Sequence, residues 1–460
     1  MYTMFEANVY KQRREALIKN FREGIILMPA NLQLPANFPK NPFKFRQDST
    51  FLYYCGIDYP DVFLAIDIDN QQTIIFGDEQ NLDDTIWTGP VETIRELADK
   101  SAINKVLPFA KLSDFLLKKK VHYIYPYQKE LVIILSELLN FPIANLQENA
   151  SELLTISTVK QRSIKEEIEI NQIEDALNTA SIPMHLLAMK NALAGKTEAE
   201  ILSLMQQIVV KNNFEMAFLP ICSVRGEILH NNTYNNTLQK GDLLLIDAGA
   251  ENKMHYASDI TRTTPVNGKF TTQQKEIYQI VLNAQLTCIE SLKTGVMYRD
   301  IHFIAAKTIS QGLIDLGLIN TSADEAINLG LHTLFFPHGI GHMLGLDVHD
   351  MENLGEDYVG YDETIQRSTE FGTAFLRLAK KVEKNNIVTV EPGIYFIPEL
   401  IQKWEADKIF TDKLNYNQLK KYLDFGGIRI EDTVLVNNTN ASVLGKKLPK
   451  SIEEIETLFK

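Results

Sequence analysis

Two kinds of hydrophobic pattern divide the chain, and the first occupies about the first 160 residues. Short apolar runs that fit strands alternate there with amphipathic segments that fit helices. The predicted strands are residues 24–28, 62–68, 73–76 and 123–125, and the predicted helices lie around 9–20, 93–97 and 131–139. This alternation predicts a small α/β domain over residues 1–160.

A different pattern begins near residues 159–163. Ser163 and Glu166 have the spacing of a capping box, in which two side chains satisfy the first free amides of a helix. The same start signal recurs at 197–200 and 271–274, before amphipathic segments. The strand-like runs of this region are 243–248, 260–263, 387–390 and 428–436, and a charged, mostly helical insertion is expected at 397–425. The pattern predicts a second domain of helices and strands over residues 161–460.

Composition narrows the class of protein. The chain has 460 residues, and its 46 Lys and Arg against 59 Asp and Glu give a formal net charge of 46 − 59 = −13. A content of 45% hydrophobic and 23% charged residues excludes a mostly disordered chain or a fibrous repeat. Because the balance is acidic, we expect no nucleic-acid and no membrane partner.

The cysteines and the first residues of the chain indicate the cellular compartment. Cys55, Cys222 and Cys288 are widely spaced, which indicates a reducing compartment and no disulfide framework. The first residues lack the apolar stretch of a signal peptide, and no run of about 18 apolar residues predicts a transmembrane helix. We therefore expect a cytoplasmic protein.

The first candidate for chemistry is a pair of carboxylates on two strand-like runs. Asp247 lies six residues before position 253, and Asp259 lies six residues after it. A hairpin turning there would place the two side chains opposite each other, with Cβ atoms roughly 4.5–5.5 Å apart. Two facing carboxylates repel unless a cation lies between them. The segment alone leaves two interpretations open, a cation site or a pair of solvated turn carboxylates.

The second candidate is a histidine-rich loop. His338, His342 and His349 fall within twelve residues of a chain that has nine histidines. Gly339 and Gly341 argue against a regular helix, so the four-residue spacing is not the helical zinc signature. Apolar neighbours would bury these rings, which favours a ligand-binding loop over ordinary loop histidines.

Two more carboxylates stand at the ends of apolar strands. Glu391 follows the run 387–390 and precedes a Pro-Gly turn. In the run 428–436, strand alternation places Arg429 and Glu431 on one face. Each glutamate taken alone is more often a surface or salt-bridged charge than a metal ligand.

Together these residues indicate a metal site. Four carboxylates and an imidazole form a hard, oxygen-rich ligand set that suits Mn(II), and also Co(II), Fe(II) or Zn(II). Four negative charges balance two divalent cations. Two cations about 3.5–4 Å apart lower the pKa of a shared water and polarise a carbonyl. The carboxylates are Asp247, Asp259, Glu391 and Glu431.

Five motifs, LIDAG, SDITRT, HGIGHMLGLDVHD, TVEPGIYF and GGIRIED, follow one another along the chain. With them the sequence resembles the pita-bread metallopeptidases, in particular the Xaa-Pro branch with aminopeptidase P and prolidase. The resemblance runs from about residue 45 to residue 444, and FRQDSTFLYYCGI is similar to the N-terminal domain of that branch. It implies an α+β fold, in which a smaller α/β domain precedes a pita-bread catalytic domain with a curved antiparallel sheet. It also implies a homo-oligomer, either a dimer or a tetramer.

The resemblance assigns roles to individual residues. Two divalent cations, with Mn(II) as the first choice, would be held by Asp247, Asp259, His342, Glu391 and Glu431, and the bridging carboxylates of the branch match Asp259 and Glu431. Glu391 would also carry the proton of the attacking water toward the leaving nitrogen. Further catalytic residues match by motif: His230, His338, His349 and Arg429.

The implied activity is release of the first residue from Xaa-Pro-peptides. A prolyl nitrogen bears no hydrogen, so a site that binds the ring by shape selects Pro after the scissile bond. A prolidase, which cleaves only Xaa-Pro dipeptides, is the alternative. Arg377 lies where prolidase-like sequences often carry an arginine for the product carboxylate, although a plain loop or helix-face charge is an equal interpretation. A non-catalytic peptide-binding module on the same fold is the more distant alternative.

Overall fold

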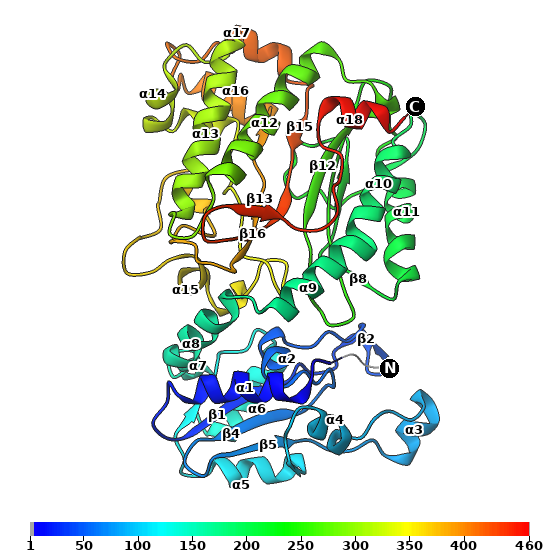
Figure 1. The fold of residues 1–460 in the computed structure, drawn as a ribbon, viewed down its shortest axis with the longest axis vertical. Helices are drawn as coiled ribbons and strands as arrows, with labels where there is room; N and C mark the ends of the chain where they lie inside the picture. The colour runs from blue at the N-terminus through cyan, green and yellow to red at the C-terminus, as the bar shows by residue number, and fades with distance from the viewer. Residues whose placement is uncertain (1–3, 460) are drawn as a thin grey trace. The chain divides into compact units, whose positions relative to one another are not determined.

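The computed structural model describes residues 4–459, and the chain divides into two compact units (Figure 1). Unit 1 contains the residues up to Arg162 together with the short stretch Asn353–Tyr358. Unit 2 contains Ser163–Glu352 and the residues from Val359 onward.

Unit 1 is built around a mixed sheet with the strand order β6-β5-β4-β1-β7. The three central strands pair antiparallel, and the two outer strands join them in parallel. Ile25, Leu27, Phe63 and Phe76 belong to the hydrophobic core of this unit. The strands are β1 (Ile25–Pro29), β2 (Pro35–Phe38), β3 (Asn41–Pro42), β4 (Phe63–Asp67), β5 (Gln72–Phe76), β6 (Lys105–Leu107) and β7 (Val121–His122). The helices are α1 (Ala7–Ile18), α2 (Ser49–Cys55), α3 (Leu82–Thr88), α4 (Ile94–Lys100), α5 (Leu112–Leu116), α6 (Lys129–Leu139), α7 (Ile143–Leu146) and α8 (Glu152–Ser163).

One strand expected in this region is displaced. The run 123–125 is not a strand, because β7 ends at His122. Tyr123 leaves the sheet: its hydroxyl donates to the carbonyl of Leu146 at 2.6 Å, and its carbonyl accepts from the amide of Ser151 at 2.8 Å. A buried tyrosine hydroxyl needs such a hydrogen-bond partner, and Tyr123 finds it outside the sheet, directly after the end of β7.

Unit 2 contains long helices and short antiparallel strands. Its helices are α9 (Glu167–Ala176), α10 (Ile182–Lys190), α11 (Glu198–Lys211), α12 (Thr272–Ser291), α13 (Tyr298–Asp315), α14 (Ala323–Asn328), α16 (Pro398–Ala406), α17 (Tyr416–Leu419) and α18 (Ile452–Thr457). The short α15 (Glu356–Gly360) begins in the stretch that belongs to unit 1. The strands are β8 (Glu215–Met216), β9 (Ile221–Ser223), β10 (Leu243–Ala248), β11 (Ala250–Glu251), β12 (Ile260–Pro265), β13 (Ile387–Val390), β14 (Gly393–Tyr395), β15 (Gly427–Arg429), β16 (Asp432–Val436) and β17 (Ala441–Val443).

These strands form antiparallel ladders that meet in the middle of unit 2. The ladders are β12-β10-β9, β13-β16-β17, β14-β15 and β11-β8. An isolated antiparallel bridge between Thr261 and Glu431 joins the first ladder to the start of β16. In the view of Figure 1, β13 and β16 run across the direction of β12, so the combined surface bends. Helix α12 packs along α13 and against β13, β14 and β15.

The expected start signals are correct at two of three places. Thr197 and Thr271 form capping boxes at the starts of α11 and α12. The box expected at Ser163 is wrong: α8 extends through Ser163, and the N-cap of α9 is Glu166, which forms a capping box with Glu169. The Ser163 carbonyl instead accepts a hydrogen bond from the Asn386 side chain at 2.9 Å.

The insertion at 397–425 is helical, as expected. It carries α16 and α17 and connects β14 to β15, the two strands of one ladder. Across the described residues, no helix has both the length and the apolar character that a bilayer crossing requires.

A buried ion pair stabilises the side of β16 that faces away from Glu431. Asp432 accepts hydrogen bonds at 2.7 Å from Arg262, Lys450 and Gln285. Burial alone would raise the pKa of Asp432, but the charges of Arg262 and Lys450 outweigh it and lower the pKa to about 2. The carboxylate is therefore ionised at neutral pH and stabilises the folded chain.

Replacing Asp432 should strongly destabilise unit 2. In Asp432→Asn the buried Arg262 loses its counter-charge, and we expect the free energy of unfolding at pH 7 to fall by about 3–5 kcal/mol. The difference from the unmodified chain should shrink as pH falls below about 4, because the contribution of a carboxylate with a lowered pKa is lost there. Urea unfolding measures both effects. The exposed Asp424→Asn is the matched control, with an expected change of at most about 0.5 kcal/mol, and an equally small loss for Asp432→Asn would contradict the prediction.

Candidate metal centre

Asp247 and Asp259 come from neighbouring strands, in a register different from the one expected. β10 and β12 pair with Asp247 opposite Thr261, so Asp259 lies two positions away and just before β12. A simple hairpin does not form, because β11 intervenes and pairs with β8. Positions two apart share one face, so the carboxylates meet diagonally rather than directly. They are still near each other: after burial, the charge of Asp247 does most to raise the pKa of Asp259.

His342 is oriented as metal-binding histidines commonly are. Its Nδ1 lies 3.0 Å from the carbonyl oxygen of Met343. A carbonyl only accepts, so Nδ1 carries the hydrogen and Nε2 of the neutral ring has a free lone pair. Nε2 lies 3.5 Å from Asp259 Oδ2 and 3.8 Å from Glu391 Oε1. A ring N–H held by a carbonyl fixes the tautomer that binds a metal through the other nitrogen.

The glycines of the histidine-rich loop let it lie against β13. A Cβ at Gly341 would come 2.1 Å from the carbonyl oxygen of Thr389, so no larger residue fits. The amide of His342 donates to Thr389 Oγ1 at 3.2 Å, and the amide of Glu391 donates to the carbonyl of Ile340 at 2.9 Å. These contacts bring an imidazole and a carboxylate to the same place.

Glu431 occupies a break between two strands. The run 428–436, expected as one strand, divides because β15 ends at Arg429 and β16 begins at Asp432. Glu431 Oε2 accepts from Thr261 Oγ1 at 2.7 Å, and the same hydroxyl accepts from Arg429 Nε at 3.2 Å. The Glu431 carboxylate is therefore held by Thr261 of β12, although Glu431 itself lies between β15 and β16.

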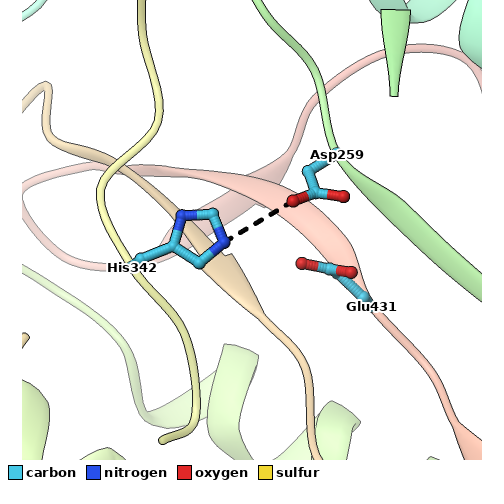
Figure 2. A group of neighbouring side chains, drawn as sticks. All are labelled: Asp259, His342 and Glu431. Carbon is cyan, nitrogen blue, oxygen red and sulfur yellow. Dashed lines mark ion pairs between the residues drawn. The ribbon is translucent and has the colours of Figure 1, made fainter. Parts of the chain in front are cut away.

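Figure 2 shows the side chains of Asp259, His342 and Glu431 pointing toward one another. One ligand atom of each lies within 4.8 Å of the others, and all three residues are buried. Within residues 4–459, one oxygen each of Asp247, Asp259 and Glu431 is buried and has no hydrogen-bond partner. Leaving such oxygens unpaired is costly, and a divalent cation at this place would satisfy them. The donor set therefore fits a divalent metal.

The carboxylates of this cluster raise one another's pKa values. Burial, followed by repulsion from Asp247 and Glu391, raises the pKa of Asp259 well above its ordinary value. Burial and then repulsion from Asp259 do the same for Glu431. Burial also raises the pKa of Glu391. Without cations, the folded chain keeps these groups ionised at neutral pH only at a cost in stability.

Arg429 holds the outer side of the cluster. Its Nη2 donates to Asp247 Oδ2 at 2.6 Å, and its Nη1 donates to the Tyr395 hydroxyl at 2.8 Å. That hydroxyl lies 2.8 Å from His338 Nε2, and His338 Nδ1 lies 2.7 Å from the carbonyl of Gly339. Both ring nitrogens of His338 are therefore engaged. Burial and then the charge of Arg429 lower the pKa of His338 to about 3, so the ring is neutral at pH 7.

The remaining candidates lie around the cluster. Partial burial and then the neighbouring arginines lower the pKa of His230. The ring centroids of His349 and His342 are 4.0 Å apart. Arg377 is paired, because its Nη1 donates to Glu352 Oε2 at 2.6 Å.

Three side chains that shape the site were missed in the sequence. Tyr395 and Thr261 lie inside the motifs TVEPGIYF and SDITRT, so their place beside predicted ligands was a usable signal. Glu352 follows His349 by three residues and lies outside the motifs. The one available signal in the sequence was its position three residues after His349.

Removing one charge from the cluster should stabilise the cation-free protein. A carboxyl group whose pKa is raised on folding binds more protons in the folded than in the unfolded chain, so stability falls as pH rises above its ordinary pKa. We expect Asp259→Asn to raise the Tm of the chelator-treated protein at about pH 7.5, and to raise it less at about pH 5.5.

Cations should reverse this order. At a Mn(II) concentration about 100 times Kd, binding to the folded chain adds about 2.7 kcal/mol to its stability. The Tm of the unmodified protein should therefore rise with Mn(II), and that of Asp259→Asn should rise much less. A cation-free Asp259→Asn protein with a lower Tm than the unmodified chain at both pH values would contradict the electrostatic account.

Two sequence families match this chain. Metallopeptidase family M24 matches residues 171–438, which include all five predicted ligands, and the aminopeptidase P N-terminal domain matches residues 10–125. A probable Xaa-Pro aminopeptidase of Fusarium vanettenii is 30% identical over 440 residues, which cover 95% of this chain and 92% of the relative.

Solved structures give the same result. Aminopeptidase PepP of Pseudomonas aeruginosa has a TM-score of 0.82 and 26% identity, with 99% of this chain and 98% of that chain covered. A zinc-substituted aminopeptidase P of Escherichia coli in complex with product has a TM-score of 0.81 and 26% identity, with 99% of both chains covered. The expected architecture, a smaller α/β domain before an α+β pita-bread domain with a curved antiparallel sheet, is confirmed. The chain belongs to metallopeptidase family M24.

Proposed function

We propose that this chain is a metal-dependent Xaa-Pro aminopeptidase, which removes the first residue from peptides with Pro at the second position. The observation that carries this proposal is the buried donor cluster of Asp259, His342 and Glu431, in a chain similar to Xaa-Pro aminopeptidases over nearly its whole length. The related E. coli enzyme is described in complex with a substrate and with the inhibitor Pro-Leu, which supports a peptide as the substrate class. These relatives are enzymes, which disfavours a non-catalytic peptide-binding module.

Two divalent cations would complete the site, held by the five residues predicted from the sequence. When bound, they supply an activated water at neutral pH and polarise the scissile carbonyl. We propose Mn(II), because the donors are mostly carboxylate oxygens. The E. coli relative is described as zinc-substituted, so Zn(II) is the second metal to compare.

Glu391 is the carboxylate best placed to move a proton. Its side chain is 17% exposed, and Oε1 lies 3.8 Å from His342 while Oε2 lies 4.0 Å from His338 Nδ1. Asp259 and Glu431 are more deeply buried, at 4% and 1% exposed. A carboxylate in this position can take a proton from water and pass it to the leaving nitrogen.

Arg429 has a positioning role in this proposal. It is buried, and its pKa is raised well above its ordinary value, so it stays charged. Its fixed fork holds the Asp247 carboxylate and the Tyr395 hydroxyl together, and Tyr395 in turn sets the His338 ring. The domain limits 1–160 and 161–460, a homodimer or homotetramer and a cytoplasmic location stay predictions from the sequence.

The purified chain should release the first residue from an Xaa-Pro-Pro tripeptide in the presence of Mn(II). We expect activity to disappear with a chelator and to return when Mn(II) is added back. Free amino acid is measured by chromatography, and the same tripeptide with Ala in place of the second residue is the specificity control. Equal rates with and without chelator, or equal rates on both peptides, would exclude the proposed function.

Glu391→Gln should separate proton transfer from folding. The substitution keeps the shape of the side chain but removes the base, so we expect kcat to fall by about 10²–10⁴-fold in a variant that still folds. Metal content of the purified variant shows how much of the loss follows from weaker cation binding. The exposed Glu399→Gln is the matched control, and a kcat within threefold of the unmodified enzyme would remove Glu391 from the mechanism.

A further inference from the structure

Glu352 contacts two side chains of the site at once. Its Oε2 lies 3.1 Å from His349 Nδ1 and 2.6 Å from Arg377 Nη1. The three residues come from the end of the histidine-rich segment and from a loop that precedes β13. One carboxylate oxygen thus receives hydrogen bonds from a predicted catalytic ring and from a predicted substrate-binding arginine.

The contact with Glu352 fixes the His349 ring. An ionised carboxylate only accepts, so Nδ1 of His349 carries a hydrogen and Nε2 is the nitrogen left for a substrate. The ring lies 4.0 Å from His342, centroid to centroid, so it is held against the metal cluster. A carboxylate behind an imidazole sets its orientation and stabilises the charged ring when a proton arrives, as in the Ser-His-Asp arrangement.

The contact with Arg377 changes what that arginine can bind. Burial would raise the pKa of Glu352, but the hydrogen bond from His349 and the charge of Arg377 outweigh it and lower the pKa to about 2. Burial lowers the pKa of His349 to about 4, so its ring is neutral at pH 7 and acts on Glu352 as a hydrogen-bond donor. The carboxylate is ionised, and it neutralises the guanidinium locally. A dipeptide carboxylate that approached Arg377 would therefore meet the charge of Glu352 as well.

The length of the peptide substrate then decides whether its carboxylate is repelled by Glu352. In an Xaa-Pro dipeptide the free carboxylate is on the proline itself, next to the scissile bond. In a tripeptide the carboxylate lies one residue further on, about 3.3–3.6 Å more along an extended chain, and a neutral amide takes its place. Only the dipeptide places a carboxylate where it and Glu352 compete for Arg377.

We infer that Glu352 is a positioning and specificity-determining residue: it orients His349 for the reaction and occupies Arg377, and so it disfavours Xaa-Pro dipeptides against longer Xaa-Pro-peptides. The inference rests on the proposed aminopeptidase function and decides between that function and the prolidase alternative. A purely structural role does not account for the arrangement, because Arg377 and Glu352 are 32% and 22% exposed and such pairs contribute at most about 1 kcal/mol. Variants at Glu352 should therefore fold.

The test compares Ala-Pro-Ala with Ala-Pro in the presence of Mn(II). For Glu352→Gln we expect the ratio of kcat/KM for the tripeptide to kcat/KM for the dipeptide to fall at least tenfold, mainly because KM for the dipeptide falls. We also expect kcat on the tripeptide to fall about tenfold, because the His349 ring loses its charged partner. Glu352→Asp, which restores the charge, should return the ratio most of the way. The exposed Glu363→Gln removes the same charge from a nearby loop and should leave both constants unchanged.

Two double variants test whether the change in dipeptide preference acts through Arg377 and whether the loss of kcat acts through His349. Adding Arg377→Gln to Glu352→Gln should abolish the gain on the dipeptide, and in a His349→Ala background Glu352→Gln should lower kcat no further. An unchanged ratio and unchanged kcat in Glu352→Gln would overturn the inference, as would a dipeptide gain that survives the loss of Arg377. A wild-type enzyme that prefers Ala-Pro would also overturn it, while leaving a metal-dependent Xaa-Pro peptidase. A wild-type enzyme that cleaves neither peptide would instead refute the proposed function.

Discussion

Mutual repulsion among buried carboxylates is the constraint on which the rest of this structure depends. Burial and the charges of neighbouring carboxylates raise the pKa values of Asp259, Glu431 and Glu391. Single oxygens of Asp247, Asp259 and Glu431 are buried without a hydrogen bond. Such an arrangement is costly for the chain alone, and divalent cations turn the same charges into a binding site. The same carboxylates that destabilise the cation-free chain are thus the groups that would bind the cations.

The fold supplies the rigidity that such a cluster needs. β10 and β12 bring Asp247 and Asp259 together, and the bridge between Thr261 and Glu431 adds the second ladder. Asp432, the first residue of β16, forms the buried ion pair with Arg262, whereas the preceding Glu431 belongs to the donor cluster. Around the ligands, Arg429, Tyr395 and Glu352 orient side chains without belonging to the cluster. Side chains that contact the cluster from outside in this way set the geometry of the site and its preference among substrates.

The sequence pointed to the residues of this cluster but not to their arrangement. Asp247, Asp259, Glu391 and Glu431 were visible because an acid at the end of an apolar strand is unusual, and motif resemblance added His342. The register was wrong, because β11 leaves the hairpin to pair with β8, and a pairing with a distant strand leaves no local signal. The capping box at Ser163 was wrong because α8 continues through that residue. Glu352 was missed because its importance comes from Arg377, which lies 25 residues away along the chain. A sequence pattern reveals a residue whose type is unusual for its position. Contacts between segments that are distant along the chain become visible only in the folded structure.

The most direct test of the central claim is a crystal structure of the protein grown with Mn(II), with anomalous scattering recorded to locate the metal. The account predicts two strong peaks among Asp247, Asp259, His342, Glu391 and Glu431, each within coordination distance of the oxygens that are unpaired in the chain alone. Absence of peaks at this place, or manganese bound only elsewhere on the molecule, would contradict it.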